Sequence, residues 1–165
     1  MQKSLKEIAQ ITMGQSPKSS AYNQNSIGLP FLQGRTTFGR MYPSFDTWTT
    51  EWNKECDVND ILFTVRAPVG DVNIAQTKIA LGRGVASIRA KNVLPKYLYY
   101  LLFANKSTFI ASSSGTIYDS INKDQLDNVK LEVHDIDDQR HIVDTIQTLF
   151  AIYLLLYLQV LCSRP

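Results

Sequence analysis

The sequence predicts a mixed, strand-rich α+β domain followed by one long C-terminal helix of the dimerising, coiled-coil-like kind. Short apolar runs separated by Gly, Pro, Asn and Ser fill most of residues 1–136, and such runs are typical of strands joined by turns. Helical spacing is confined to a few short stretches of that region. Over residues 137–165, apolar residues recur at every third or fourth position, which predicts the long helix.

The composition is that of one globular domain. With 165 residues, 44% hydrophobic and 10% aromatic, the chain can bury a substantial core. The N-terminus has no apolar segment of the kind found in secretory signals. Cys56 and Cys162 form no CxxC pair, so we predict neither a disulfide framework nor a zinc site and expect a cytoplasmic protein.

The N-terminal third predicts one short helix, one long loop and one strand. Residues 5–11 place apolar side chains on one helical face, although the β-branched pair Ile11 and Thr12 also fits a strand. Residues 14–28 are polar and predict a loop. Residues 29–34 predict a short strand that ends at a glycine.

The middle of the chain predicts four strands and a helix. Residues 60–76 indicate two strands bent around the Pro-Val-Gly segment at 68–70. Residues 78–90 indicate a strand, a tight Gly-Arg-Gly turn and a second strand. Residues 94–106 indicate a helix that begins at Pro95, because proline is well tolerated in the first helical turn.

The next segment predicts three short elements. Residues 112–116 are small and polar and predict a loop. Residues 121–129 predict a short helix with Asn122 as its N-cap. Residues 130–134 predict a strand.

Six apolar positions near the C-terminus follow a heptad spacing, which predicts a helix of about 24 residues with a dimerisation seam. They are Ile142, Ile146, Leu149, Tyr153, Leu156 and Val160. Residues 149–158 are apolar throughout, so a membrane span is the competing interpretation. A span needs roughly 20 apolar residues, whereas this run is flanked by Gln147 and Gln159. We therefore expect burial against a partner and no membrane.

Motifs of the common catalytic classes are missing from the sequence. There is no Gly-x4-Gly-Lys-Ser/Thr phosphate loop. No proline is followed by a second proline or by aspartate, so the Asn/Asp-Pro-Pro-aromatic motif of amino-methyltransferases and the commonest nuclease signature are both missing. We predict no catalytic residues and no cofactor.

The only two histidines, His134 and His141, lie near acidic residues and are the best candidates for a metal site. Zinc takes His and carboxylate ligands, and a metal-dependent hydrolase is the enzyme that such a site would serve. The cluster lies in a polar stretch before the predicted helix, however, where aspartate commonly caps a helix. We predict Asp137 or Asp138 as that cap and no bound metal.

The charges are unevenly distributed along the chain. Residues 1–118 carry 13 Lys and Arg against 7 Asp and Glu, and residues 119–165 carry 4 against 8. A basic body with an acidic end suits a nucleic-acid surface on the body and a different partner for the end. A randomly charged surface explains the same numbers, so charge alone leaves both interpretations open.

Polar and cationic side chains on the predicted loops are the candidate binding residues. Arg, Gln, Ser and Thr side chains read base edges and hold phosphates. The candidates are Gln15, Ser16, Lys18, Arg35, Thr36, Arg40, Arg66, Arg83, Ser113, Thr116 and Tyr118. Each of them is also compatible with an ordinary surface role, and Arg66 with an ion pair to Asp71 across the bend.

Five stretches follow one another in an order that resembles a known family. They are LKEIAQITMGQSP, GLPFLQG, DILFTVRAPVGDVNIA, SSGTIYDSINKDQLDNVKLEV and DQRHIVDTI, which together span about residues 4–148. This order resembles one target recognition domain, with its following helix, of the DNA-specificity subunit of type I restriction-modification systems. The loop at 14–23 resembles the family's entry into the recognition domain.

The resemblance implies a non-catalytic protein that binds double-stranded DNA. A full subunit of this family has two recognition domains separated by two long antiparallel helices, and each domain reads half of a split target. Modification (methyltransferase) and restriction subunits carry out the chemistry. A chain with one such domain would be a half-subunit that pairs with a second copy of itself or with a different half-subunit.

The chain departs from the family in three respects. It has half the length of a full subunit. Its stretch EVHDIDDQ (132–139) has no proline, where the family commonly has an Ile-Pro-x-Pro run. After Phe150 the helix lacks the polar Asp and Asn positions of the family. The remaining interpretations are a protein-interaction module that keeps the fold without binding DNA, and the metal-dependent hydrolase.

Overall fold

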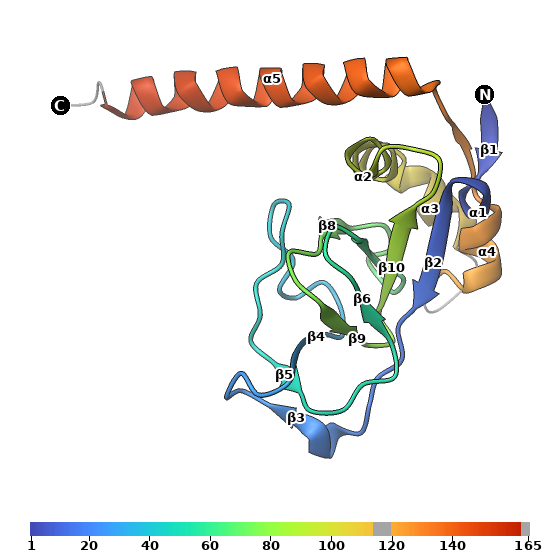
Figure 1. Cartoon of the computed structure of the whole chain (residues 1–165), viewed down its shortest axis with the longest axis vertical. Coiled ribbons are helices and arrows are strands. Elements are labelled where there is room, and N and C mark those ends of the chain that lie inside the picture. Colours follow the sequence, from blue (N-terminus) through green and yellow to red (C-terminus); the bar gives the residue numbers. More distant parts are fainter. Residues whose placement is uncertain (114–119, 163–165) are drawn as a thin grey trace.

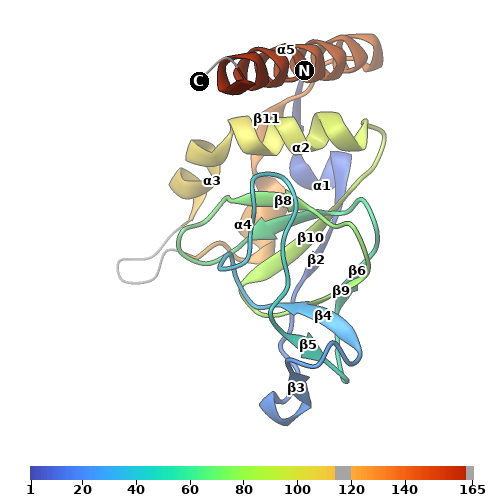
Figure 2. The same ribbon diagram turned by 90° about the vertical axis from the view of Figure 1, so that its left-hand side faces the viewer.

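The computed structural model describes residues 1–113 and 120–162, the last three of them as backbone alone. It combines short strands, short helices and one long C-terminal helix, which confirms the predicted α+β class (Figure 1). Within these residues the strands form sheets of two, four and five members. In Figure 2 the helices α2 and α5 are layered above the larger sheets.

A two-stranded sheet joins the N-terminus to the segment before the last helix. β1 (Gln2–Ser4) pairs antiparallel with β11 (Lys130–Glu132). The amino group of Met1 donates a hydrogen bond of 2.9 Å to the carbonyl of Val133. One helical turn, α1 (Leu5–Ile8), follows β1 directly. The first residues of the chain are therefore held by their pairing with β11 and by the hydrogen bond from Met1 to Val133.

The helix predicted over residues 5–11 is only this one turn long. Ala9 is already extended, and β2 (Ala9–Met13) follows. Ile11 is buried in that strand, opposite Ile88. The strand alternative for Ile11 is therefore correct, because β-branched side chains pack well on a pleated sheet.

The four-stranded sheet is antiparallel throughout, in the order β2–β10–β7–β8. Its other strands are β7 (Ile61–Thr64), β8 (Val72–Ile74) and β10 (Val85–Ala90). β7 and β8 are the two strands predicted over residues 60–76. The bend that joins them contains a cis peptide bond between Ala67 and Pro68.

The five-stranded sheet has the order β3–β5–β4–β9–β6, and within it β4 and β9 pair parallel. Its strands are β3 (Tyr22–Asn23), β4 (Leu29–Leu32), β5 (Trp48–Thr49), β6 (Glu55–Cys56) and β9 (Ile79–Leu81). The predicted loop at 14–28 thus contains a strand, preceded by a 3₁₀ turn, η1 (Ser19–Ala21). The tight Gly-Arg-Gly turn is present as predicted, since the Val85 amide donates to the Gly82 carbonyl at 3.1 Å. It carries the chain from β9 of the five-stranded sheet to β10 of the four-stranded sheet.

Three short helices cover the four-stranded sheet. They are α2 (Pro95–Ala104), α3 (Lys106–Ser112) and α4 (Lys123–Asn128). α2 begins at Pro95 as predicted, but the helical run ends at Asn105 and resumes as α3. Asn122 caps α4 as predicted, since its side-chain oxygen accepts a hydrogen bond of 2.9 Å from the Gln125 amide.

Two apolar clusters stabilise these layers. The larger lies between the four-stranded sheet and the helices, and Phe63 and Phe109 meet edge to face at its centre with ring centroids 4.9 Å apart. The smaller brings Leu32, Ile79 and Leu81 of the five-stranded sheet together with Leu62 of β7 and Val85 of β10. This cluster therefore packs the five-stranded sheet against the four-stranded one.

The last helix, α5 (Ile136–Cys162), is long, as predicted, but it begins earlier and has a different cap. The side-chain oxygen of Asp135 accepts hydrogen bonds from the backbone amides of Asp137 (3.1 Å) and Asp138 (2.9 Å). Asp135 is therefore the N-cap, and the prediction of Asp137 or Asp138 is wrong. Both of those residues lie in the first turn of α5, where their negative charges interact favourably with the helix dipole.

In the described part of α5, buried side chains lie only in the first turns. Val143 is buried, and the side chain of buried Gln139 accepts a hydrogen bond of 2.9 Å from the Leu94 amide at the start of α2. Residues 148–159 are all exposed. The second half of α5 consequently projects away from the sheets, as Figure 1 shows.

A buried carboxylate connects β7 and β10. Asp60 accepts hydrogen bonds from Arg89 Nε (2.7 Å), Ser87 Oγ (2.9 Å) and the Asp57 amide (3.0 Å). Burial raises the pKa of Asp60, but these hydrogen bonds, that of Arg89 above all, hold the pKa below its ordinary value. The charged form of Asp60 is therefore the one that stabilises the fold.

Asp60→Asn should lower the free energy of unfolding at pH 7 by about 1.5–3 kcal/mol, the range for hydrogen bonds to a charged group. The folded-state pKa of Asp60 lies below its unfolded-state pKa. The difference from the wild type should therefore be complete above the unfolded-state value of about 4, and should shrink as the pH falls through the lower folded-state value. Urea denaturation at several pH values measures this.

Asp57→Asn is the matched control. Asp57 pairs with Arg89 and Lys78, but its side chain is half exposed, and exposed ion pairs contribute at most about 1 kcal/mol. We expect a smaller loss than for Asp60→Asn. Equal losses in the two variants that do not change with pH would contradict a stabilising charge on Asp60.

Candidate functional site

Three glycines bring the two larger sheets into direct backbone contact. Gly14 follows β2, and Gly82 and Gly84 lie between β9 and β10. A Cβ atom at Gly14 would lie 2.1 Å from the Gly82 carbonyl oxygen, and one at Gly84 would lie 2.2 Å from that of Gln33. No side chain fits at these distances, so the contact requires glycine. We call Gly14, Gln33, Gly82 and Gly84 the glycine junction.

Hydrogen bonds hold the polar loop after β2 against this junction. The amide of Gln15 donates to the Leu81 carbonyl at 2.8 Å. The amide of Arg83 donates to Ser16 Oγ at 3.1 Å. Ser16 is thus a structural partner of the Arg83 backbone, while the side chains of Gln15 and Arg83 remain exposed.

A third loop reaches the junction from the other side. The amide of Val65, which follows β7, donates to the Gly84 carbonyl at 3.0 Å. The next residue, Arg66, is exposed, and its backbone bridges to Ser120. The junction therefore brings the backbone next to Arg66 close to the backbone next to Arg83, although the two residues are 17 positions apart in the sequence.

A polar groove of about 780 Å³ lies beside the junction. The chain runs from Gln33 of the junction through Gly34 to Arg35, which lines the groove. Side chains with polar or charged groups in the wall are Arg35, Thr36, Arg40, Asp71, Asn73 and Lys106. Asp71 binds two of these cations, Arg35 through Nη1 at 2.8 Å and Lys106 through Nζ at 2.5 Å.

The two cationic partners of Asp71 favour its ionised form. Its partial burial raises the pKa, but the hydrogen bonds from Lys106 and Arg35 and their positive charges hold the pKa below the ordinary aspartate value. Two cations share one carboxylate, so the group keeps a net positive charge. The Arg35 side chain is 55% exposed and uses only one of its nitrogens for this contact.

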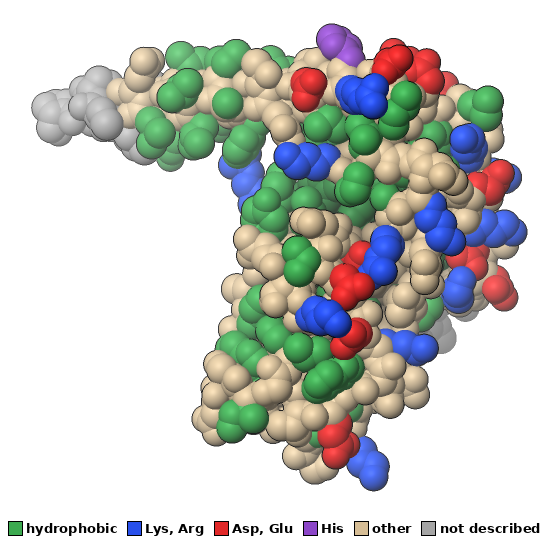
Figure 3. Space-filling model, in the orientation of Figure 1, with side chains coloured by type: hydrophobic (Ala, Val, Ile, Leu, Met, Phe, Trp, Pro, Cys, Tyr) green, Lys and Arg blue, Asp and Glu red, His purple; other side chains and the backbone are tan. Residues whose placement is uncertain are grey.

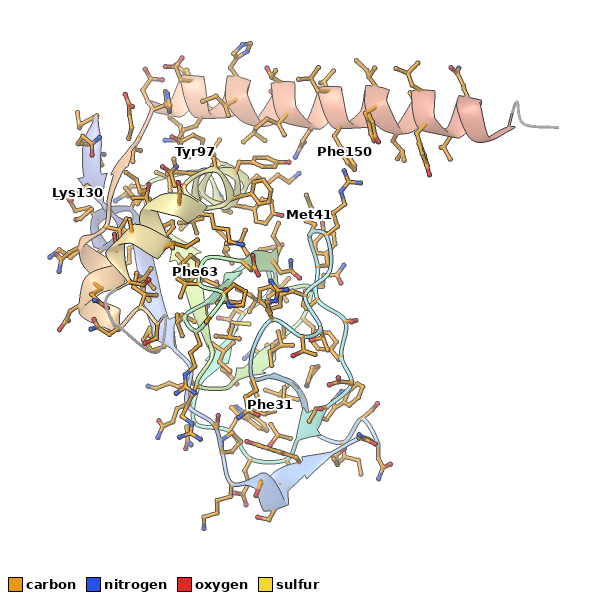
Figure 4. All side chains as sticks on the ribbon, turned by 180° about the vertical axis from the view of Figure 1, so that it is seen from behind. Phe31, Met41, Phe63, Tyr97, Lys130 and Phe150 are labelled. Carbon is orange, nitrogen blue, oxygen red and sulfur yellow. The ribbon has the colours of Figure 1, made fainter. Side chains whose placement is uncertain are left out.

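Arg40 connects the groove to the projecting helix. Its guanidinium lies over the ring of Phe150 in α5, 4.4 Å from the ring centroid, in cation–π contact. Figure 4 shows Met41, the next residue, in the part of the loop that reaches up to α5 near Phe150. Arg40, one of the predicted binding residues, thus already has an aromatic partner within the chain.

The candidate side chains are distributed as follows. Gln15, Ser16, Lys18, Arg66 and Arg83 lie at the glycine junction or in the loops that leave it, and Arg35, Thr36 and Arg40 line the groove. Ser113 ends α3, where its hydroxyl donates to the Ile110 carbonyl at 2.6 Å. Thr116 and Tyr118 lie outside the described residues. The interpretation of Arg66 as the partner of Asp71 is wrong, since Arg35 and Lys106 occupy both carboxylate oxygens.

Sequence reasoning overlooked Asp71 and Lys106 as members of the site. Asp71 is 36 positions from Arg35 and 35 from Lys106, and no spacing rule connects such residues. The one available signal was the Pro-Val-Gly-Asp bend, because a charged residue directly after a tight turn is held in a defined position.

The loops that form this surface are strongly cationic. Residues 14–18, 33–40, 65–71 and 82–84 contain five Lys and Arg and a single carboxylate, that of Asp71. Clustered cations on exposed loops attract polyanions and neutralise phosphates. The junction and the groove therefore form a candidate surface for nucleic acid.

The predicted seam residues of α5 do not share one environment. Ile142 packs against the larger core, so the expectation that the seam is buried only against a second helix is wrong at that position. The exposed members of the seam are Leu149 (62%), Tyr153 (59%) and Leu156 (57%). Figure 3 shows apolar side chains along the projecting part of the helix. The side chain of Val160 lies outside the described part of the chain.

By length and hydropathy alone, α5 also meets the criteria for a membrane span over Ile136–Gln159, with a mean hydropathy of 1.5. Helices that pack against partner proteins can have the same composition. In this helix the first turns carry Asp137, Asp138 and Arg140 and pack on α2. We therefore do not take the helix as evidence for a membrane.

The histidine cluster has a structural explanation. The Nδ1 atom of His134 lies 2.9 Å from the Tyr97 hydroxyl, and the His134 amide donates to the same hydroxyl at 3.1 Å. Among the residues that the structure describes, no three His, Cys, Asp or Glu side chains lie close enough together to hold a metal ion. The hydrolase interpretation thus has no metal centre to support it in this part of the chain.

Comparisons with known proteins all identify one family. The sequence profile described as "Type I restriction modification DNA specificity domain" matches residues 1–156. A curated protein of Methanocaldococcus jannaschii, described as the MjaX type I restriction enzyme specificity subunit, is 38% identical over 141 residues. The match covers 84% of this chain and 33% of that protein, so the chain spans about a third of its relative.

Solved structures agree with the sequence comparison. A chain of a type I restriction-modification system, solved in a study of its assembly and conformational transition, is 36% identical with a TM-score of 0.79, covering 93% of this chain and 39% of that one. The HsdS subunit from Thermoanaerobacter tengcongensis is 35% identical with the same TM-score, covering 92% and 38%. The S subunit from M. genitalium, at 16% identity and a TM-score of 0.70, shows the fold alone; that match covers 90% of this chain and 38% of that one.

Gly84→Ala should lower the free energy of unfolding by about 1–3 kcal/mol, the usual cost of overpacking. The added methyl group would lie 2.2 Å from the Gln33 carbonyl, so the backbone of the junction must move apart. Urea denaturation measures the loss.

Gly34→Ala is the control, because a Cβ atom there meets nothing within 4 Å. This variant should keep the stability of the wild type or gain about 0.4–1 kcal/mol from the reduced freedom of the unfolded chain. Equal stability of the two variants would contradict a required backbone contact at Gly84.

Proposed function

Because the chain belongs to the family of type I restriction-modification DNA specificity domains, we propose that it is a half-subunit that recognises one short sequence of double-stranded DNA. Recognition is assigned to residues 1–136 and assembly to residues 137–165. The observation that carries this proposal is the cationic surface at the glycine junction and groove, where loops from both sheets converge. Loops on a rigid scaffold are the usual location of binding residues.

The surface offers the two kinds of contact that sequence recognition needs. Exposed Lys18, Arg66 and Arg83 suit phosphate contacts, which position a protein on the duplex without reading sequence. Arg35 is held by Asp71 and keeps free N–H donors, so it suits the bidentate contact to guanine O6 and N7. Gln15 and Thr36 supply further donors and acceptors beside these cations.

The chemistry of modification and restriction is assigned to partner subunits. The described residues carry none of the catalytic motifs sought in the sequence, and the chain covers a third of its curated relative. We propose a modification (methyltransferase) subunit and a restriction subunit as partners, with this chain directing both to the target. A DNA partner suits a cytoplasmic protein, which is the location that we propose.

The function is tested by sequencing the methylated sites of a host that expresses a modification subunit with and without this chain. A site that appears only with the chain identifies the target. Gel-shift titration at several salt concentrations should then show preference for that site and a strong salt dependence from phosphate contacts. Absence of any chain-dependent site and of specific binding would overturn the proposal.

Arg35→Ala should weaken binding to the identified site by about 1–3 kcal/mol and relax the preference at one base position. Removal of the side chain deletes its hydrogen-bond donors on the groove wall. Lys91→Ala is the control: Lys91 is exposed and lies next to Ala90, at the end of β10 remote from Gly84. Equal, small effects of the two variants would indicate an ordinary surface role for Arg35.

Assembly of two recognition domains is the second part of the proposal. A split target needs two domains at a fixed separation, and this chain has one. Burying a Leu side chain contributes roughly 1.5–3 kcal/mol, so the exposed apolar residues of α5 could offset the cost of association. We infer a two-fold pair of identical chains with antiparallel α5 helices. Such a pair reads the same sequence on each strand, an interrupted palindrome.

Leu149→Asp should convert the dimer to a monomer, because pairing would bury an unpaired charge. Ile27→Asp is the control, since Ile27 is also exposed and apolar but lies in the loop before β4. Light scattering at tens of micromolar protein measures both. A monomeric wild type with an intact helix would contradict the homodimer, and a non-palindromic methylation site would indicate a different half-subunit as the partner.

A further inference from the structure

One carboxylate in the groove connects two cations from distant parts of the chain. Asp71 lies just before β8, Arg35 follows β4, and Lys106 opens α3. The Asp71 oxygens each take one partner, Oδ2 from Arg35 at 2.8 Å and Oδ1 from Lys106 at 2.5 Å. The five-stranded sheet, the four-stranded sheet and a helix thus each supply one member of a charged triad.

The backbone around Asp71 is fixed by its own hydrogen bonds. The Asp71 amide donates to Thr64 Oγ1 at 2.9 Å, and this hydroxyl donates to the Pro68 carbonyl at 2.8 Å. Gly70 has a positive φ of 92°, and a Cβ atom there would lie 3.0 Å from Lys106 Cγ. The bend therefore both holds the carboxylate in place and leaves room for the Lys106 side chain to reach it.

We propose that Asp71 is a positioning residue for DNA recognition, which orients Arg35 and Lys106 in the groove before DNA arrives. The inference rests on the proposed function and extends it to Asp71, whose negative charge is repelled by the DNA phosphates. An arginine whose Nη1 is held by a carboxylate presents its remaining donors in one direction. Such a fixed fork loses less conformational freedom when it pairs with a base edge.

Because Asp71 is negatively charged, an experiment can distinguish a positioning role from a purely electrostatic effect on DNA affinity. Removing a carboxylate from a cationic surface strengthens the attraction for any DNA. If Asp71 only reduced the charge of the groove, its loss would strengthen specific and non-specific binding together. If it positions Arg35, its loss weakens specific binding while non-specific binding stays the same or strengthens.

The experiment compares the full-length wild type with Asp71→Asn, which preserves the shape of the side chain and removes the charge. Dissociation constants are measured at one salt concentration for the methylation site and for a scrambled duplex of equal length. We expect the ratio of specific to non-specific affinity to fall at least about 5-fold, the lower end of what one bidentate base contact supplies. Circular dichroism at the working temperature verifies that both proteins are folded.

Two further variants decide the cause. Asp46→Asn removes an exposed carboxylate that contacts Thr47 rather than the groove, and should leave the ratio unchanged. Arg35→Lys keeps the charge but loses the fork, and should lower the ratio by itself, with little further loss when combined with Asp71→Asn.

The outcomes separate this inference from the function on which it rests. A wild type without specific binding overturns the function and the positioning role with it. A wild type that binds its site while Asp71→Asn keeps the ratio, or while the losses from Arg35→Lys and Asp71→Asn simply add, overturns the positioning role alone. A parallel loss of both affinities together with a changed circular dichroism spectrum would assign Asp71 a structural role instead.

Discussion

The backbones of the two larger sheets touch at Gly14, Gly82 and Gly84, and the candidate DNA surface depends on this contact. The smaller apolar cluster packs the sheets together through Leu62, Val85 and Leu81, and the glycines set how closely their backbones approach. At the junction the distances leave no space for a Cβ atom, and amide–carbonyl hydrogen bonds replace side-chain packing. The loops that carry the cations leave directly from these glycines, so the junction sets where those cations stand.

Asp60 and Asp71 both form ion pairs with cationic side chains, but they differ in exposure. The Asp60 side chain is buried, and its bond to Arg89 joins neighbouring strands inside the fold. The Asp71 side chain is 24% exposed and lies on the groove wall, where its two cations keep a net positive charge that faces solvent. In both cases the pKa lies below the ordinary value, so both carboxylates stay charged at neutral pH. The charge of Asp60 stabilises the interior of the fold, and the charge of Asp71 binds two cations at its surface.

The projecting half of α5 lies beside the candidate DNA surface. Arg40 lines the groove and at the same time lies over Phe150 of the helix. The apolar side chains beyond Gln147 are exposed, which is unfavourable for an isolated chain and favours association. In the proposed half-subunit, assembly through the helix therefore takes place beside the loops that read DNA.

The sequence by itself determined the elements whose signals are local. Asn122 caps α4 through a neighbour three residues away, Pro95 opens α2, and the heptad spacing predicts α5. The tertiary structure decided the rest, because the deciding contacts join residues far apart in the chain. The Gly-Arg-Gly segment crosses between sheets, and Arg35 meets Asp71 and Lys106. The cap of α5 is local, but aspartates at 135, 137 and 138 all fit the capping rule, and the structure selects Asp135. Periodicity and capping rules act over a few residues, whereas ion pairs and backbone contacts between sheets form only once the layers have packed.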